Sequence, residues 1–238
     1  MESFQSVFKR YEKKYLVSAE QASSLMKCLQ KHMRADDYGR TTICSVYMDT
    51  PDFRLIRTSL EKPVYKEKLR LRTYGVPVAE SPAYVEIKKK YKGVVYKRRV
   101  STAYALAEAW LFHGLCVPAQ GQIESEIAWF LKSYENIAPA ASICYDRVAL
   151  YGLEDPQLRV TLDENIRYRT HDLSLFCGSG GELLIAPGER LMEIKVAGGM
   201  PLWLAEALSE LQIYPTSFSK YGNAYKAMME KKEAVQIA

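Results

Sequence analysis

The sequence predicts an α+β protein in which a closed antiparallel β-barrel of about eight strands is covered on the outside by helices. Three observations predict this architecture. Several stretches alternate charged and apolar residues with the period of a strand, as in KLRLRT at residues 68–73. Their charged positions are mostly Arg and Lys. Helices between them carry large apolar residues, such as Trp110 and Trp129, that need an apolar sheet surface to cover.

Length and composition agree with one folded domain over residues 1–238. The chain has 238 residues, of which 48% are hydrophobic, so it can bury a substantial core. Its formal charge of +5 comes from 33 basic and 28 acidic residues. This excess is modest and indicates an anionic partner only weakly, so the placement of the charges matters more than their sum.

Strands and helices alternate in the first half of the chain. Residues 9–17 predict a strand that stops at Ser18, where Ser18 and Gln21 form a capping-box pattern for a helix reaching about Arg34. The β-branched run at 41–50 predicts a strand, and 53–60 a short helix. Residues 66–75 predict a strand that ends in a glycine turn, although their Lys, Glu, Leu and Arg also favour helix. Residues 84–100 predict a β-hairpin.

The second half continues with two helices, a group of strands and two closing helices. Ser101 is the expected cap of a helix ending near Gly114, and residues 124–137 predict another helix. Strands are expected at 141–151, 157–163 and 165–169, and at 190–196 after a glycine-rich loop. The last two helices are expected to open at Pro201 and near Ser217.

The charged faces of these strands are expected to point inward. For any one strand the simpler interpretation is a charged face in solvent and an apolar face in the core. Together, however, these faces are rich in Arg and Lys, with isolated carboxylates two residues from a cation, and the helices need the apolar faces. An interior lined by cations requires a counter-charge, which a bound polyanion and a divalent metal would supply. The pattern therefore predicts a tunnel for phosphates.

Other sites and compartments are disfavoured by the sequence. The five cysteines are scattered and form no C-x-x-C motif, and the three histidines lie far apart, so neither a zinc site nor a disulfide framework is expected. The first ten residues lack the apolar core of a signal peptide, and no apolar run approaches the roughly 20 residues that cross a bilayer. We expect a cytoplasmic protein with no membrane segment of its own.

Nine motifs in order resemble the VTC-type polyphosphate polymerase domain of the triphosphate tunnel metalloenzyme superfamily, in a bacterial stand-alone form. They are FKRYEKKY, YMDTPDF, KLRLRTYG, YVEIKKK, GVVYKRRV, YDRVALYG, LRVTLD, LMEIKV with PLWL after it, and FSKYGNAY. Each motif alone is weak, but nine in sequence are specific. The resemblance implies a barrel that holds triphosphate with basic side chains and Mn or Mg with carboxylates.

The resemblance also assigns roles to individual residues. The catalytic group it implies is Lys14, Arg70, Arg72, Lys88, Arg147 and Arg159. The phosphate-binding group contains Lys14, Lys68, Arg70, Arg72, Lys88, Lys97, Arg147, Arg159, Lys195 and Lys220. The expected metal ligands are Glu193, Glu12 and Glu86, of which Glu12 and Glu86 could instead orient neighbouring lysines. Asp163 could hold a second metal or an arginine.

One departure from the superfamily bears on the reaction. Its hydrolases and cyclases open with E-x-E-x-K, whereas this chain has Arg10-x-Glu12-x-Lys14. A cation thus replaces one metal-ligand carboxylate, which disfavours a two-metal hydrolase and favours the polymerase branch.

The expected activity is transfer of the terminal phosphoryl group of ATP to a growing polyphosphate chain. The alternatives are a tripolyphosphatase or nucleotide triphosphatase, and a non-catalytic polyphosphate-binding module. ATP and inorganic polyphosphate or triphosphate are the expected partners, with no nucleic acid, since no RNA-recognition or OB-fold signature is present. The eukaryotic proteins carry membrane helices that this chain lacks, so a membrane-coupled process would need a separate partner protein.

Overall fold

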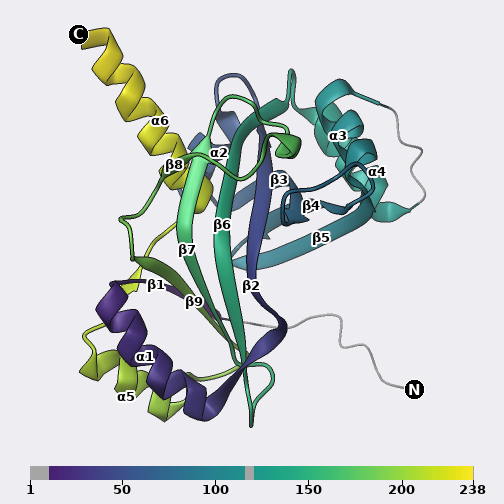
Figure 1. Cartoon of the computed structure of the whole chain (residues 1–238). Helices are drawn as coiled ribbons and strands as arrows, with labels where there is room; N and C mark the ends of the chain where they lie inside the picture. Colours follow the sequence, from purple (N-terminus) through teal and green to yellow (C-terminus); the bar gives the residue numbers. More distant parts are fainter. Residues whose placement is uncertain (1–10, 116–120, 238) are drawn as a thin grey trace. The chain divides into compact units, whose positions relative to one another are not determined.

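The computed structural model describes residues 11–115 and 121–237, which form an α+β fold (Figure 1). Within these ranges there are ten strands and six α-helices. The strands are β1 Tyr11–Val17, β2 Met33–Asp49, β3 Tyr65–Tyr74, β4 Pro82–Tyr91, β5 Val94–Ala103, β6 Ala138–Gly152, β7 Arg159–Arg169, β8 Glu182–Leu183, β9 Arg190–Val196 and β10 Pro215–Thr216. The helices are α1 Ala19–His32, α2 Arg54–Leu60, α3 Tyr104–His113, α4 Gln122–Ser133, α5 Leu202–Glu210 and α6 Lys220–Ile237. Arg10, Cys116 and the expected start of the first strand at residue 9 lie outside the described residues.

The strands form one hydrogen-bonded order, β10-β1-β9-β7-β6-β2-β3-β4-β5, with β8 paired to β7. The registers recorded for its neighbours are antiparallel. The order begins at β10 and ends at β5, and no pairing joins these two strands in the described part of the chain. Hydrogen bonds therefore do not close the sheet, and it contains ten strands rather than about eight.

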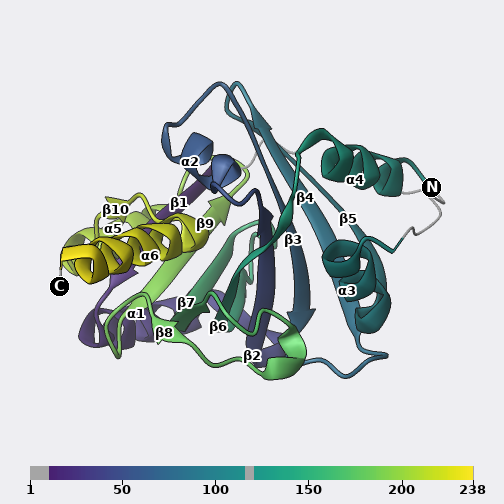
Figure 2. The same ribbon diagram turned by 90° about the horizontal axis from the view of Figure 1, so that it is seen from above.

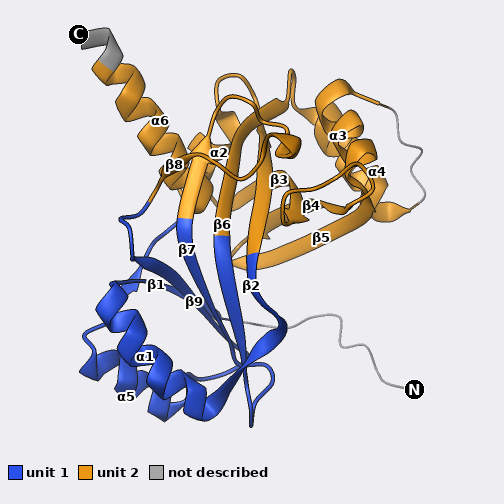
Figure 3. Ribbon diagram, viewed as in Figure 1, with its two compact units in different colours: residues 1–41, 146–165, 185–218 blue, residues 42–145, 166–184, 219–238 orange. Residues whose placement is uncertain are grey.

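The chain divides into two compact units (Figure 3). Unit 1 comprises Met1–Thr41, Asp146–Asn165 and Ile185–Phe218, and unit 2 comprises Thr42–Tyr145, Ile166–Leu184 and Ser219–Ala238. The boundaries fall inside β2, β6 and β7, each of which contributes one part to each unit. The prediction of a single domain stays a prediction.

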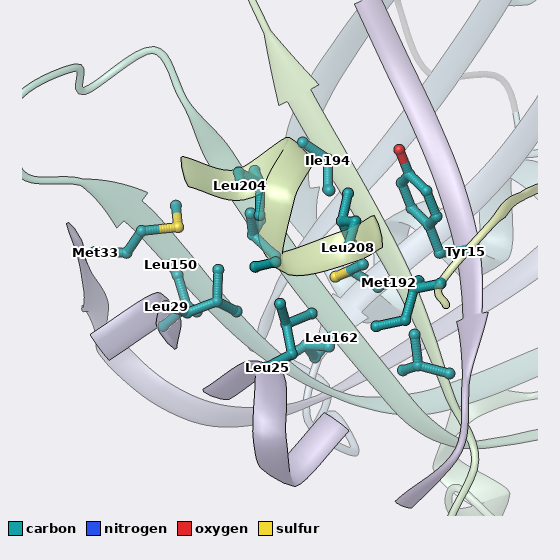
Figure 4. Packing of buried hydrophobic residues seen from close by; sticks show 14 of the residues in the cluster. Tyr15, Leu25, Leu29, Met33, Leu150, Leu162, Met192, Ile194, Leu204 and Leu208 are labelled. Carbon is teal, nitrogen blue, oxygen red and sulfur yellow. The ribbon is translucent and has the colours of Figure 1, made fainter. Parts of the chain in front are cut away.

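Helices α1 and α5 cover the apolar strand faces of unit 1. Figure 4 shows Leu25 and Leu29 of α1 and Leu204 and Leu208 of α5 directed at the apolar side chains of the strands. Met192 is among the strand residues that meet them, at 0% exposure. Glu193 and Lys195 belong to the opposite face of β9, as strand alternation requires.

Helices α3 and α4 do the same in unit 2. Figure 2 shows both helices beside β4 and β5, and α3 contacts β3, β4 and β5. Trp110 of α3 and Phe130 of α4 are buried with Leu69, Leu71 and other apolar residues of the strands. Helices α1, α3, α4 and α5 thus pack on the apolar faces, as the sequence predicts, but Trp129 of α4 is 63% exposed and is not covered as expected.

Of two capping serines that the sequence predicts, the structure confirms one. The capping box is confirmed, because Ser18 Oγ accepts a bond from Gln21 N at 3.1 Å and Gln21 Oε1 one from Ser18 N at 3.0 Å. The expected cap Ser101 is wrong: this residue lies within β5, and α3 begins after Ala103 without a side-chain cap. Strand pairing with β4 continues through Ser101 and overrides its capping preference.

Residues 157–169 differ from the expectation of two strands. They contain one strand, β7, in which Asn165 has a positive φ of 49°. Asn tolerates this left-handed conformation better than most residues. The strand therefore continues through Asn165, where a gap between two strands was expected. The hairpin at 84–100 is confirmed, with Lys92 and Gly93 at its turn, both at positive φ.

None of the helices in the described ranges combines the length and the hydropathy that a membrane span requires.

Candidate functional site

In unit 2, β3 and β4 place their charged side chains on the face opposite the helix-covered core. Leu69 and Leu71 are fully buried in that core. Arg70 and Arg72, which alternate with them along β3, therefore project from the other face. The register pairs Arg70 with Glu86 and Lys68 with Lys88. The hairpin partner β5 then adds Lys97 opposite Lys88.

Glu86 is the centre of this charged face. Its carboxylate lies 2.7 Å from Arg70 Nε, 2.7 Å from Lys97 Nζ and 3.6 Å from Arg72 Nε, and the residue is only 1% exposed. Burial by itself would raise the pKa of Glu86, but Arg70, Arg72 and Lys97 outweigh burial and lower the pKa to about 2. Glu86 is therefore a buried anion surrounded by cations.

Three cations around one carboxylate leave the Glu86 cluster (Arg70, Arg72, Lys97 and Glu86) with a local charge of +2. Both guanidinium groups are mostly buried, with side-chain exposures of 21% and 8%. Buried like charges repel strongly, so one carboxylate compensates them only in part. The cluster thus has the charge and the fork-shaped donors that suit phosphate oxygens.

Two tyrosines complete this face and were missed by the sequence reasoning. Arg70 Nη1 donates to Tyr47 Oη at 3.0 Å, and Arg72 Nη2 to Tyr145 Oη at 3.5 Å. Burial raises the pKa of Tyr47, but the neighbouring Arg70, Lys68 and Arg72 outweigh it and bring the pKa to about 8. The register of β2 with β3 sets Tyr47 opposite Arg70, and the alternation in the sequence does not predict this register.

The remaining predicted residues of unit 2 lie around this cluster. Lys68 Nζ donates to Ser219 Oγ at 3.4 Å, and Lys220 Nζ lies 4.5 Å from the centre of the Tyr145 ring. Lys88 is exposed on the same face of β4 as Glu86. Tyr221, at the start of α6, stacks on Tyr47 at 4.7 Å between ring centres. Unit 2 thus brings Lys68, Arg70, Arg72, Lys88, Lys97 and Lys220 to one face with its tyrosines.

Asp49 has a structural role. Its carboxylate accepts bonds from Leu55 N at 2.9 Å and Ile56 N at 3.0 Å, the first turn of α2, and from Tyr221 Oη at 2.8 Å. This buried carboxylate fixes the turn between β2 and α2.

In unit 1, the predicted carboxylates and lysines of β1 and β9 lie together. Lys14 Nζ is 3.4 Å from Glu193 and 3.6 Å from Glu12, and Lys195 Nζ is 3.9 Å from each of the two carboxylates. Lys14 also donates to Phe218 O at 3.0 Å. The register, in which Lys14 faces Glu193 and Glu12 faces Lys195, produces this alternating group.

Arg147 and Asp163 form a bidentate pair beside it. Arg147 Nε and Nη2 donate to the two Asp163 oxygens at 2.6 and 2.7 Å, and Asp163 is 0% exposed. Of the two partners considered for Asp163, the structure thus shows the arginine. Arg147 also lies 3.9 Å from Glu193. Arg159 is exposed and lies opposite Lys195 in the register of β7 and β9.

The carboxylates of unit 1 that suit a hard divalent cation by their chemistry are Glu12 and Glu193. Both pair with Lys14 and Lys195, at nitrogen–oxygen distances of 3.4–3.9 Å. Mg²⁺ at phosphoryl-transfer sites is usually held by one or two carboxylates together with waters and substrate phosphates. In the described residues, no group of three or more His, Cys, Asp or Glu could hold a metal. Glu86, assigned to unit 2, is engaged by cations, which agrees with the alternative that it orients its neighbours.

A cavity of about 860 Å³ in unit 2 contains none of the predicted site residues. It is lined by residues such as Phe53, His171 and Met228, and by Arg169, Lys231 and other polar groups. Arg169 donates to four backbone carbonyls of the loop after β7, and Lys231 pairs with Glu182. These cations are therefore engaged in holding the structure.

A model of the VTC domain matches residues 9–229 of the chain. This chain belongs to the VTC domain family. The match confirms the resemblance seen in the sequence motifs and covers both compact units. The comparison with curated proteins gave no match.

Solved structures share the fold of this VTC domain at low sequence identity. A candidate adenylate cyclase from Bacillus halodurans is 15% identical, with a TM-score of 0.56, over 87% of this chain and 92% of its own. An adenylyl cyclase candidate from Hippeastrum, described as having a dominant triphosphatase activity, is 14% identical with a TM-score of 0.52, over 88% and 92% of the two chains. These similarities establish the fold alone.

Proposed function

We propose that this VTC domain is a metal-dependent phosphotransferase that moves the terminal phosphoryl group of ATP onto a growing inorganic polyphosphate chain. The observation that carries the proposal is the Glu86 cluster, in which three cations gather around one buried carboxylate. Membership of the VTC family supports the same substrate class. The finer fold prediction, a closed tunnel with the charged faces inside, is part of this proposal.

The Glu86 cluster suits a triphosphate for electrostatic reasons. Arg70 and Arg72 are held by Glu86 and the two tyrosine hydroxyls, so their forks are oriented before a ligand arrives. Phosphoryl transfer depends mainly on positioning and on neutralising the charge of the transferred group. A bound triphosphate would neutralise the local charge of +2 that the Glu86 cluster carries. The attacking phosphate oxygen of the chain is already ionised, so no general base is required.

Glu193 and Glu12 are the residues proposed to hold Mn or Mg. A metal held by these two carboxylates would supply Lewis-acid polarisation of a phosphate group. In the absence of a ligand, Lys14 and Lys195 neutralise the two carboxylates. The same lysines could then turn to phosphate oxygens.

The proposal is tested by incubating the purified protein with ATP and Mn²⁺. We expect release of ADP and a ladder of polyphosphate on a gel. The variant Glu193→Gln should lose the ladder while still binding tripolyphosphate. Glu210→Gln, at an exposed position of α5, is the matched control and should retain it. A protein that binds tripolyphosphate but makes no product from ATP with any divalent metal would be the non-catalytic binding module instead.

A tripolyphosphatase or nucleotide triphosphatase is the second candidate. The fold similarity to the Hippeastrum protein with its described triphosphatase activity favours it. Release of free phosphate without any ladder would identify this activity. The replacement of a carboxylate by Arg10 argues against it, and Arg10→Glu should then increase phosphate release relative to ladder formation. A cytoplasmic location, the lack of nucleic-acid partners and a membrane partner protein stay predictions.

A further inference from the structure

Beyond the Glu86 cluster, the charged face of β3 and β4 continues as a row of lysines toward the hairpin turn. Lys66 lies directly opposite Lys90, and Lys68 directly opposite Lys88. Lys62 precedes β3 and is close enough to act electrostatically on Lys66. Like charges directly opposite each other destabilise a sheet. Such pairs in two successive rows therefore indicate a selective reason other than stability.

The two faces of the same strands treat their charges differently. On the helix-covered face, Lys89 and Arg98 reach Glu126 of α4 at 3.5 and 2.6 Å. On the lysine face, the described lengths of β3, β4 and β5 carry a single carboxylate, Glu86, which already faces three cations. The positive charge therefore accumulates on one face.

Crowding of the lysines is visible at Lys66. Its ammonium donates to Ser59 O at 2.9 Å and is partly buried. Burial lowers the pKa of Lys66, and repulsion by Lys90, Lys62 and Lys88 lowers it further. A polyanion placed over this group would relieve the repulsion.

We propose that Lys62, Lys66 and Lys90, here called the distal lysines, form a second anion site that binds the part of a linear inorganic polyphosphate extending beyond the triphosphate at the Glu86 cluster. The inference rests on the proposed function and defines its substrate as a chain longer than triphosphate. Arg70 and Lys66 are four residues apart on β3, which corresponds to about 13 Å of strand. Lysine acts as a point charge without a fixed fork, so it holds a chain without fixing its register.

The distribution of aromatic residues favours inorganic polyphosphate over single-stranded nucleic acid. Nucleic-acid sites interleave cations with aromatic rings on which bases stack. Here Tyr65, Tyr91 and Tyr96 alternate with the lysines in sequence and so project from the opposite face of the strands. The lysine row near the turn thus offers charge without a stacking surface.

The test compares the affinities of two ligands, tripolyphosphate and long-chain polyphosphate, in calorimetric titrations at fixed salt. The variant Lys66→Gln/Lys90→Gln should lose about tenfold in affinity for the long chain and stay within about twofold for tripolyphosphate. Lys62→Gln/Lys90→Gln removes two exposed charges and leaves the bond from Lys66 to Ser59 intact, so it should show the same selectivity without a folding defect. Lys27→Gln/Lys31→Gln, on exposed positions of α1, has the same net charge and should bind both ligands normally.

Each other outcome overturns the inference in a recognisable way. Equal losses for both ligands would mean that the distal lysines act only through the general field of the cluster. If these variants bound the long chain as tightly as the unaltered protein, the second site would be ruled out and the proposed function would be unaffected. Failure of the unaltered protein to bind either ligand would overturn the proposed function itself. Stronger competition by an oligonucleotide or by anionic lipid vesicles than by polyphosphate would assign the lysines to a different partner.

Discussion

At the scale of single residues, Glu86 decides how the basic face of unit 2 is held together. Its carboxylate is the shared partner of Arg70, Arg72 and Lys97, and it is almost completely buried. A buried carboxylate among three cations stabilises the fold chiefly because its removal would leave those charges without compensation. It also leaves a surplus of positive charge for a ligand.

Replacing this carboxylate should separate stability from binding. We expect Glu86→Gln to lower the free energy of unfolding by about 3 kcal/mol, since it leaves buried cations without an anion. The same change should raise the affinity for tripolyphosphate, because the local charge increases from +2 to +3. Chemical denaturation and titration calorimetry measure the two effects. Glu80→Gln, at an exposed position, is the control, and an unchanged stability of the Glu86 variant would contradict its central place.

The affinity for tripolyphosphate should fall as the pH rises through about 8. Burial lowers the pKa of Lys97 to about 8 despite the attraction of Glu86, and the cations around Tyr47 bring its pKa to about 8 as well. The Lys97 side chain is 43% exposed, and its ammonium lies 2.7 Å from the buried carboxylate of Glu86. Below pH 8 the two groups are a cation and a neutral phenol; above it they become neutral and anionic. The local charge then changes from +2 toward 0.

This pH dependence is measured by titrating tripolyphosphate between pH 7 and 9.5, around the two pKa values. Tyr47→Phe should reduce the fall in affinity with pH, because the phenolate can no longer form. Lys97→Gln should also reduce it, because no ammonium is left to lose its proton. A profile that is identical in both variants and in the unaltered protein would show that neither group titrates at the site.

At the scale of the elements, alternation in the sequence predicted the strands and their faces well. β3, β4 and β9 occur where the charged and apolar residues alternate, and their apolar faces pack beneath helices. The register between strands is not encoded in this alternation. The contacts of Tyr47 and Tyr145 with the arginines therefore became visible only in the structure.

Signals that depend on one residue were less reliable than periodic ones. Ser18 caps α1, whereas Ser101 has an equally good capping side chain and lies in a strand. The pairing of β4 with β5 outweighs the capping preference of Ser101. The preference of one residue cannot predict such pairing. Similarly, Asn165 continues β7 through an irregular conformation instead of ending it.

The cap of α1 provides an element-scale prediction. Ser18→Ala should lower the free energy of unfolding by about 1 kcal/mol, because it leaves the amide of Gln21 without its acceptor. Ser24→Ala, at an exposed position within the same helix, should change stability by less than about 0.5 kcal/mol. Equal effects of the two changes in denaturant titrations would mean that the capping box contributes nothing.

For the molecule as a whole, the net charge is modest, but charged side chains are concentrated in two groups. The formal charge is +5, yet each compact unit contains its own group of predicted ligands. Unit 1 holds the carboxylates proposed for a metal, and unit 2 the cations proposed for phosphates. The match to the VTC domain, over residues 9–229, includes residues of both units.

The prediction of a single domain can be tested by calorimetry. Strands β2, β6 and β7 each run from one unit into the other without a break in the strand. Because unfolding of either unit would disrupt these strands, we expect one cooperative transition, with equal calorimetric and van't Hoff enthalpies. Two separated transitions would show that the units unfold independently.

The cations around Glu86 are proposed to bind a triphosphate. A crystal structure of the protein with tripolyphosphate and Mn²⁺ would reveal whether they do. We predict phosphate oxygens within hydrogen-bond distance of Arg70, Arg72 and Lys97. Tripolyphosphate bound elsewhere, with these three side chains still engaged only by Glu86 and the tyrosines, would contradict the account.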